Sequence, residues 1–142
     1  RRASAWTGRT IASMRVYDVL RCLEFLRTLR GVNPEKISLA ARDEMTVVAL
    51  YATLMDGGCQ ALLLVNPPAT QDAASQPDGR GAAIEMLNCL RFTDVWQMPA
   101  LLFPMPIVFL ENRPDVFRWS ENIYKDLGRP DGIRIIQNLA DF

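Results

Sequence analysis

Histidine is absent from this chain of 142 residues. Its imidazole titrates near neutral pH and serves as the general base in the Ser-His-Asp triad, so the chain contains no complete triad of that kind. Histidine is also a common metal ligand, and the carboxylates show no compact cluster with the spacing of a calcium loop. The sequence therefore predicts neither a metal site nor a bound cofactor.

Long apolar runs and an excess of one charge are also missing. The longest apolar runs, residues 61–65 and 104–110, are far shorter than the roughly 20 residues that span a bilayer. The 16 Lys and Arg residues balance the 16 Asp and Glu residues, which indicates neither a nucleic-acid partner nor an anionic membrane. Gly57 and Gly58 precede a predicted strand rather than a helix, which argues against a phosphate-binding loop.

Cysteine is scarce, odd in number and widely spaced. Cys22, Cys59 and Cys89 each lie in an apolar stretch, so we expect buried reduced thiols rather than a disulfide or a metal site. The length suits one domain, residues 1–142. Because the chain opens on Arg1 without an initiator methionine or an apolar signal segment, we expect a piece of a longer product.

The apolar pattern changes period several times along the chain. Spacings of three and four predict helices, and short unbroken apolar runs predict strands covered on both faces. Helices are expected over residues 10–30, 44–55, 82–90, 93–102 and 114–127, strands over residues 37–41, 59–66, 106–110 and 132–137, and a loop over residues 69–80. This alternation predicts an α/β fold, a three-layer sandwich with a parallel sheet of about four strands.

Several segments in this order resemble a known family. Residues 36–51 read as a strand, a tight turn and an amphipathic helix, and further matching segments are residues 14–27, 32–39, 65–68 and 101–110. On these segments the chain resembles the C-terminal half of an α/β-hydrolase superfamily protein, most like the acetyl xylan esterase and prolyl-oligopeptidase branch. The resemblance implies that the four strands correspond to the last four of the usual eight.

The resemblance also implies candidate site residues. In the family a nucleophilic serine occupies the turn, with a small residue two positions away on either side. Here Asp43 takes its place, and Ala41 and Met45 flank it. The backbone N–H of Glu44 would be the remaining oxyanion donor. The family's triad acid follows the third strand of this chain, where Glu111 and Asp115 are the two possible matches. A simpler interpretation makes Asp43 and Asp115 capping or first-turn acids of helices.

Three hypotheses about function follow. The first is a catalytically degenerate hydrolase-like domain, a pseudoenzyme with a role in assembly or ligand binding. The second is an esterase whose missing parts come from an absent N-terminal half or a partner chain. The third, a dehalogenase-like enzyme with Asp43 as a carboxylate nucleophile, lacks the histidine that its second step needs.

The strand at residues 37–41 carries no lysine or proline to protect a free edge. We therefore expect a homo-oligomer, most simply a two-fold dimer, or attachment to a missing N-terminal half.

Overall fold

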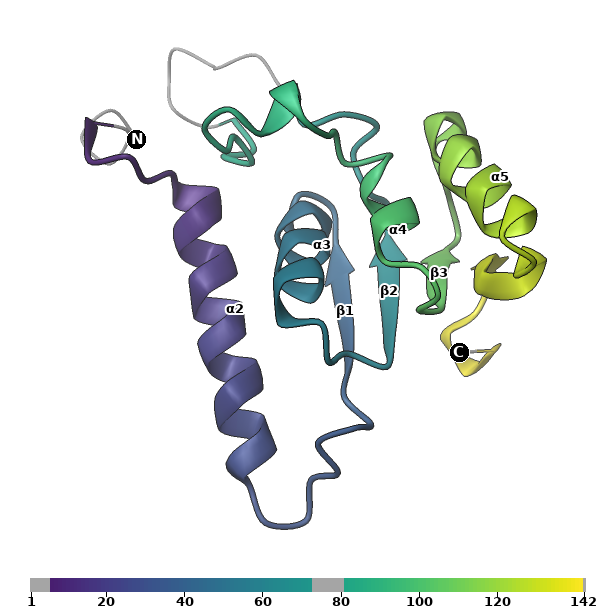
Figure 1. The fold of residues 1–142 in the computed structure, drawn as a ribbon, viewed down its shortest axis with the longest axis horizontal. Helices are drawn as coiled ribbons and strands as arrows, with labels where there is room; N and C mark the ends of the chain where they lie inside the picture. Colours follow the sequence, from purple (N-terminus) through teal and green to yellow (C-terminus); the bar gives the residue numbers. More distant parts are fainter. Residues whose placement is uncertain (1–5, 73–80, 142) are drawn as a thin grey trace.

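The computed structural model describes residues 6–72 and 81–141, so most of the expected loop at residues 69–80 lies outside the described residues. Four parallel strands form one sheet in the order β1-β2-β3-β4 (Figure 1). The strands are β1 (Ser38–Arg42), β2 (Ala61–Val65), β3 (Ile107–Leu110) and β4 (Ile133–Ile136), and the α-helices are α2 (Ile11–Thr28), α3 (Met45–Asp56), α4 (Met98–Leu101) and α5 (Arg118–Asp126). The expected α/β class with four parallel strands is confirmed.

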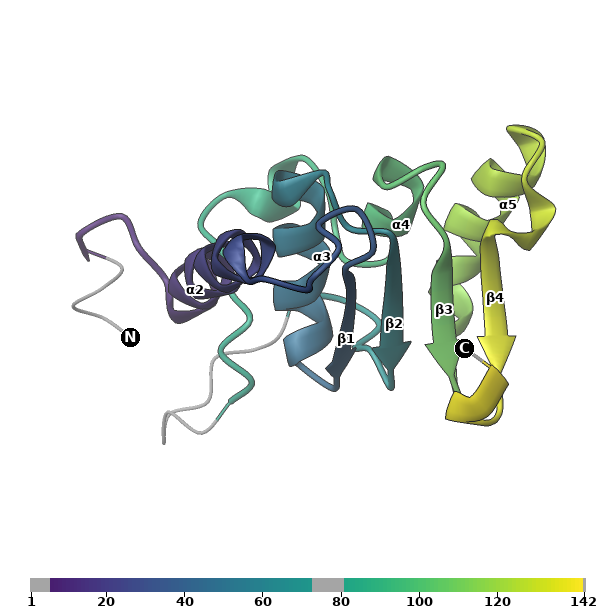
Figure 2. The ribbon, with the colours of Figure 1, turned by 90° about the horizontal axis from the view of Figure 1, so that it is seen from below.

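Helices α3, α4 and α5 cover one face of this sheet, and α2 lies beside α3, beyond β1 (Figure 2). Three successive crossovers of the same hand, each leading to the next strand along, place α3, α4 and α5 on the same side. The main core lies there, between the helices and strand residues such as Leu62, Leu64 and Phe109. The opposite face carries a smaller cluster of strand residues, Leu63, Val108 and Ile136, with Leu110 against it. The described residues thus form two layers, and they do not supply the third layer of the expected sandwich.

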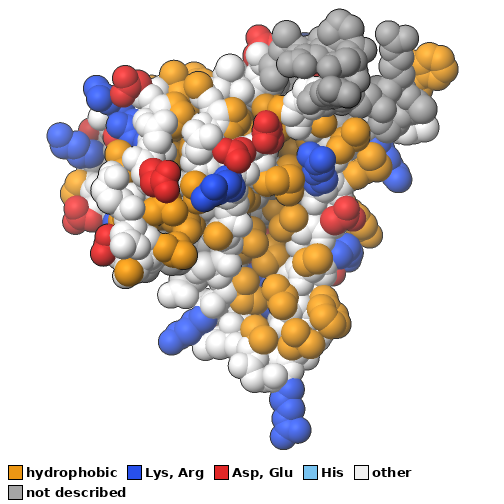
Figure 3. All heavy atoms as spheres, turned by 180° about the vertical axis from the view of Figure 1, so that it is seen from behind, with side chains coloured by type: hydrophobic (Ala, Val, Ile, Leu, Met, Phe, Trp, Pro, Cys, Tyr) orange, Lys and Arg blue, Asp and Glu red, His pale blue; other side chains and the backbone are white. Residues whose placement is uncertain are grey.

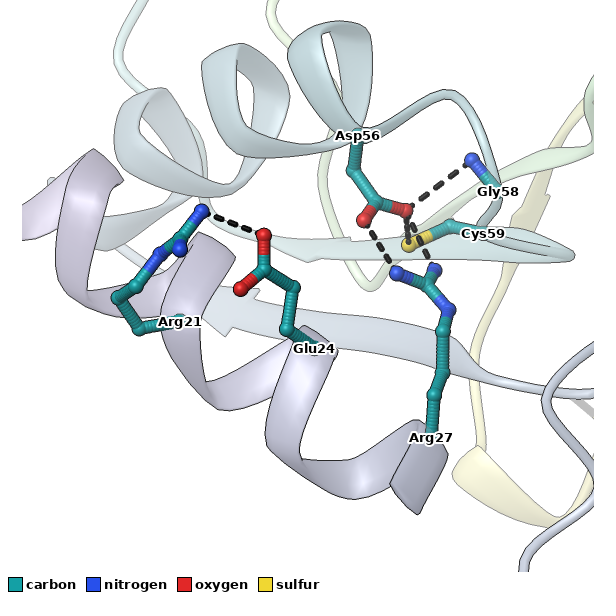
Figure 4. A network of polar contacts seen from close by, with 6 residues as sticks. All are labelled: Arg21, Glu24, Arg27, Asp56, Gly58 and Cys59. Atoms are coloured by element: carbon teal, nitrogen blue, oxygen red, sulfur yellow. Dashed lines mark hydrogen bonds and ion pairs between the residues drawn. The ribbon is translucent and has the colours of Figure 1, made fainter.

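Helix α2 is fixed to α3 by an ion pair at its C-terminal end (Figure 4). Arg27 donates two hydrogen bonds of 2.6 Å to the two carboxylate oxygens of Asp56, whose side chain is only 5% exposed. Gly58 N–H and the Cys59 thiol donate to the same carboxylate. The hydrogen bonds from Arg27 hold the pKa of Asp56 below its usual range. This pair links two helix ends that are 29 residues apart in the sequence.

The segment between β2 and β3 differs from the prediction. The helix expected over residues 82–90 is wrong, because only a single 3-10 turn, Cys89–Arg91, forms there. The helix expected over residues 93–102 is reduced to the four residues of α4. Asp94 accepts hydrogen bonds from Gln71 N–H and the Thr70 hydroxyl, and these tertiary contacts replace a helical ladder. The spacing of apolar residues between 82 and 102 arises because these side chains pack on the core, and it does not indicate a helix.

Two further expectations concern the cysteines and the membrane. The three thiols are free, as expected, but Cys22 is exposed, and Cys59 and Cys89 are only partly buried. The prediction that all three are buried is therefore wrong, since the apolar stretch around Cys22 is one face of an amphipathic helix.

Within residues 6–72 and 81–141, no helix combines the length and the apolar character that crossing a bilayer requires.

Candidate functional site

The expected strand, turn and helix are present at residues 38–56. Asp43 is the apex, with a left-handed φ of 50° between the end of β1 and the start of α3. Its N–H donates to Val65 O at 2.9 Å, and its carbonyl accepts from Thr46 N–H at 3.1 Å and from the Thr46 hydroxyl. Aspartate adopts this backbone region more readily than most residues, so the turn closes without glycine.

Three neighbouring strands end in the same unusual way. Asp43, Asn66 and Glu111 each follow a strand directly and have positive φ values of 50°, 50° and 68°. The residues before them, Arg42, Val65 and Leu110, are register partners, so the three side chains follow one another along the carboxyl edge of the sheet. This is the edge at which open α/β sheets bind ligands. A strained backbone at three adjacent positions marks this rim as the candidate site.

Two of these rim residues interact directly. Asn66 donates a hydrogen bond from its side-chain nitrogen to the Asp43 carboxylate at 2.7 Å. The pair lies beside Glu44, Pro67 and Pro68 around an open depression of about 290 Å³. The Asn66 amide donates to one carboxylate oxygen of Asp43, and no described residue donates to the other oxygen, which could accept a hydrogen bond from a ligand. Asn66 was not among the residues singled out in the sequence, although an asparagine between a strand and Pro67 is a turn signal.

The helix-capping interpretation of Asp43 is not supported. The N-cap of α3 is Glu44, and no side chain makes a capping hydrogen bond to this helix. The Asp43 carboxylate faces Asn66 instead, because the left-handed turn directs it away from the helix N–H groups. Among the described residues, nothing accepts a hydrogen bond from Glu44 N–H. This donor is the group that the resemblance assigned to an oxyanion.

The two candidate acids after β3 lie in different surroundings. Glu111 is exposed on the rim, and its N–H donates to Ile136 O at 2.9 Å. Asp115 lies in the 3-10 turn Asp115–Phe117, where its side chain is 83% exposed and forms an ion pair with Arg118 at 3.1 Å. Only Glu111 therefore shares the rim with Asp43.

A buried network holds the chain that follows Asn66. The Tyr51 hydroxyl donates to the side-chain oxygen of Gln71 at 2.9 Å, and the side-chain nitrogen of Gln71 donates to Ile84 O at 3.1 Å. Gln71 is 3% exposed, and burial raises the pKa of Tyr51 above its usual range. These hydrogen bonds satisfy polar groups that would otherwise be buried without partners. They fix the path of the chain behind the rim.

The described residues contain no group of three or more acidic or cysteine side chains placed to hold a metal ion. The carboxylates of Asp43 and Glu111 can each accept hydrogen bonds at this rim. Such a rim suits a ligand that presents donors to a carboxylate.

Comparison with known proteins gives a fold. No protein-family model matches the sequence, and no curated protein matches it. A crystal structure of a proposed acetyl xylan esterase from Bacteroides fragilis superposes with a TM-score of 0.76 at 15% sequence identity. The alignment covers 98% of this chain and 39% of that one, so this chain spans well under half the length of its structural neighbour. The chain has the fold of an esterase-like α/β protein.

Proposed function

We propose that this chain is a catalytically degenerate α/β-hydrolase-like domain whose role is assembly or ligand binding rather than hydrolysis. The main support for this proposal is that Asp43 lies at the apex of the turn and that its carboxylate is hydrogen-bonded to Asn66. The chain has no histidine that could activate a nucleophile or a water molecule beside it.

The chemistry of a carboxylate at this position supports the proposal. Attack by Asp43 on the carbonyl carbon of an ester would form a mixed anhydride and release the alcohol, and attack on an alkyl carbon would form an ester and release the leaving group. Either product must then be hydrolysed by a water molecule that a general base activates. Glu111 is exposed on the rim, and among the described residues no basic side chain forms an ion pair with it. Without a histidine base, we expect this second step to limit any turnover at Asp43.

The assembly role is supported by the free edge of β1. In a parallel sheet the outer strand offers unpaired N–H and C=O groups, which a further strand can use. A two-fold dimer or an N-terminal half of the fold would each cover this edge. The rim around Asp43 and Asn66 would then lie next to the interface between β1 and the segment that covers its edge.

The alternative function is an esterase whose missing catalytic parts come from another polypeptide segment. The neighbour whose fold is similar is a proposed acetyl xylan esterase, and the matched region is 39% of its chain. In this alternative the free N–H of Glu44 keeps its role as an oxyanion donor. The base and the second donor would come from outside this chain.

Hydrolysis of p-nitrophenyl acetate tests the proposal. We expect the purified chain to hydrolyse it no faster than an Asp43→Asn variant and no faster than a Glu35→Gln variant, which changes an exposed carboxylate and serves as a surface control. A robust activity that is lost in Asp43→Asn and retained in Glu35→Gln would contradict the proposal of a degenerate domain and support the esterase alternative.

A further inference from the structure

A cavity of about 340 Å³ lies at the amino edge of the sheet, opposite the rim around Asp43. Its lining includes Thr53 and Leu54 near the end of α3, Cys59 and Gln60 just before β2, and Phe103 and Met105 just before β3. In Figure 1 the arrowheads mark the carboxyl edge, and the length of β2, five residues, separates the two edges by roughly 16 Å. The volume is typical of a pocket for a small molecule.

The wall formed by α3 contains a buried hydroxyl that has no hydrogen-bond partner. Thr53 is 1% exposed, and among the described residues its Oγ1 is the only buried side-chain oxygen that forms no hydrogen bond. Most buried hydroxyl groups in folded proteins have a partner, so this exception needs an explanation. Because the hydroxyl is shielded from bulk water, a group placed inside the cavity could complete its hydrogen bonding.

The Cys59 thiol lies beside this hydroxyl. It donates to the Asp56 carboxylate at 3.5 Å (Figure 4). Burial raises the pKa of Cys59 to about 11, so the thiol is uncharged at neutral pH. The Thr53 hydroxyl is close enough to the sulfur to oppose part of this rise in the pKa, but no hydrogen bond satisfies the hydroxyl oxygen. The thiol proton is already used, and the Thr53 hydroxyl remains available as a donor.

The cavity offers no charge to a ligand. Among the described residues that line it, none has a charged side chain. Asp56, which accepts from the Cys59 thiol, is paired with Arg27 through two hydrogen bonds of 2.6 Å. An ion that entered the cavity would lose its hydration without gaining a partner of opposite charge. The lining therefore favours an uncharged molecule with an apolar body.

The wall before β3 is held in place by contacts with the C-terminal part of the chain. The Tyr124 hydroxyl donates to Met105 O at 2.8 Å, and the Arg129 guanidinium donates to Pro104 O at 2.9 Å. The rings of Phe103 and Tyr124 meet edge to face, with their centroids 5.2 Å apart. A wall that is fixed in advance lowers the entropy cost of binding a ligand.

The opposite face of the sheet lacks this combination of features. Seen from behind, hydrophobic side chains are exposed across the middle of the molecule (Figure 3). The cluster of Leu63, Val108 and Ile136 belongs to this face, and it includes no unpartnered buried oxygen among the described residues. An apolar surface alone does not specify a ligand, whereas a buried hydroxyl beside an apolar cavity specifies one polar group and its position.

We propose that this cavity binds a small uncharged molecule with an apolar body and one carbonyl oxygen, which accepts a hydrogen bond from the Thr53 hydroxyl. The apolar body packs against Leu54, Phe103 and Met105. The volume equals that of about eleven water molecules, which suits a ligand the size of a substituted benzene. This site is separate from the Asp43 rim, so it goes beyond the function proposed above.

The test uses acetophenone, a neutral ketone, and benzoate, an anion with the same number of non-hydrogen atoms. Binding to the intact chain is followed by NMR of isotope-labelled methionine methyl groups. Met105 lines the cavity, whereas Met45 begins α3 beside the turn at Asp43. We expect acetophenone to shift the Met105 signal saturably with a Kd of about 1 mM and to leave Met45 unchanged. Benzoate should bind about tenfold more weakly.

Three variants locate the binding more closely. Thr53→Val keeps the volume of the side chain and removes the hydroxyl, so acetophenone should bind about fivefold more weakly. Leu54→Trp fills part of the cavity and should weaken binding at least about tenfold. Met55→Trp is the matched control at the next position of α3, where the side chain is 67% exposed, and it should leave binding unchanged. Circular dichroism checks that each variant is folded.

The outcomes separate this inference from the proposed function. No saturable shift of Met105 at up to about 20 mM acetophenone, or equal affinity in the unmodified chain and in folded Leu54→Trp, would overturn the site. Equal affinity in folded Thr53→Val would overturn the assigned hydrogen bond and with it the ligand class. Saturable binding at Met105 in a chain whose ester hydrolysis depends on Asp43 would support this inference and contradict the proposal of a degenerate domain.

Discussion

The ion pair between Arg27 and Asp56 should be one of the most sensitive points of the fold. Replacing Arg27 with methionine keeps the aliphatic stem but removes both 2.6 Å hydrogen bonds to a carboxylate that is 5% exposed. Removing one partner of a fully buried pair costs about 3–5 kcal/mol. Arg27 is itself 24% exposed, and Gly58 N–H still donates to Asp56, so water and this donor offset part of the loss. We expect a loss of about 2–3 kcal/mol in the free energy of unfolding.

Urea unfolding followed by circular dichroism measures this loss. The exposed pair Arg21–Glu24 on the same helix is the matched control, and Arg21→Met should cost less than about 1 kcal/mol. The double variant Arg27→Met with Asp56→Leu should recover part of the stability, because it no longer leaves a buried charge without a partner. A cost for Arg27→Met no greater than for Arg21→Met would refute the reasoning.

The same pair gives a pH dependence whose sign follows from the pKa shift. The folded state holds the pKa of Asp56 below its unfolded value of 3.8. The stabilisation is therefore fully present above that value and is lost as the pH falls through it toward the folded pKa. Between about pH 5 and pH 2.5 the unmodified chain should lose more stability than Asp56→Asn does. Parallel stability curves for the two proteins across this interval would contradict the assignment.

Two further predictions concern buried groups. Burial, together with the nearby Asp56 charge, raises the pKa of the Cys59 thiol to about 11. At neutral pH iodoacetamide should therefore label the exposed Cys22 well before Cys59. Equal labelling rates of the two thiols, measured by mass spectrometry, would argue against this environment for Cys59. A Cβ added at Gly132 would clash with the buried Tyr124 ring. Gly132→Ala should therefore lower the free energy of unfolding, measured by thermal unfolding, by about 1–3 kcal/mol. A loss as small as that caused by Asp131→Ala at the neighbouring exposed position would contradict this packing.

The strands and the turn at Asp43 could be read from the sequence because their signals are local. An unbroken apolar run such as Ala61–Val65 has one simple solution, a strand buried in a parallel sheet. The residue at the turn must accept a left-handed backbone, and aspartate does so more readily than most. The expected helix over residues 82–90 failed because its apolar spacing served contacts with the core, as Ile84 and Met86 show.

The arrangement of Asn66 and Glu111 along one rim could not be predicted from local sequence patterns. Asn66, Glu111 and Asp43 share a positive φ, but their order along one rim, with Asn66 between the other two, depends on the register between β1, β2 and β3. Register is a property of strands that are distant in sequence, so only the assembled sheet brings these residues to one rim.

The sequence by itself determined the fold class, the four strands, the apex at Asp43 and the absence of a histidine base. The tertiary structure decided which face the helices cover, that α2 extends beyond β1, and that an apolar cavity forms at the amino edge of the sheet. The physical reason is that a periodic sequence specifies which residues must be buried but not what buries them. That depends on the hand of the crossovers and on the contacts between segments far apart in the chain.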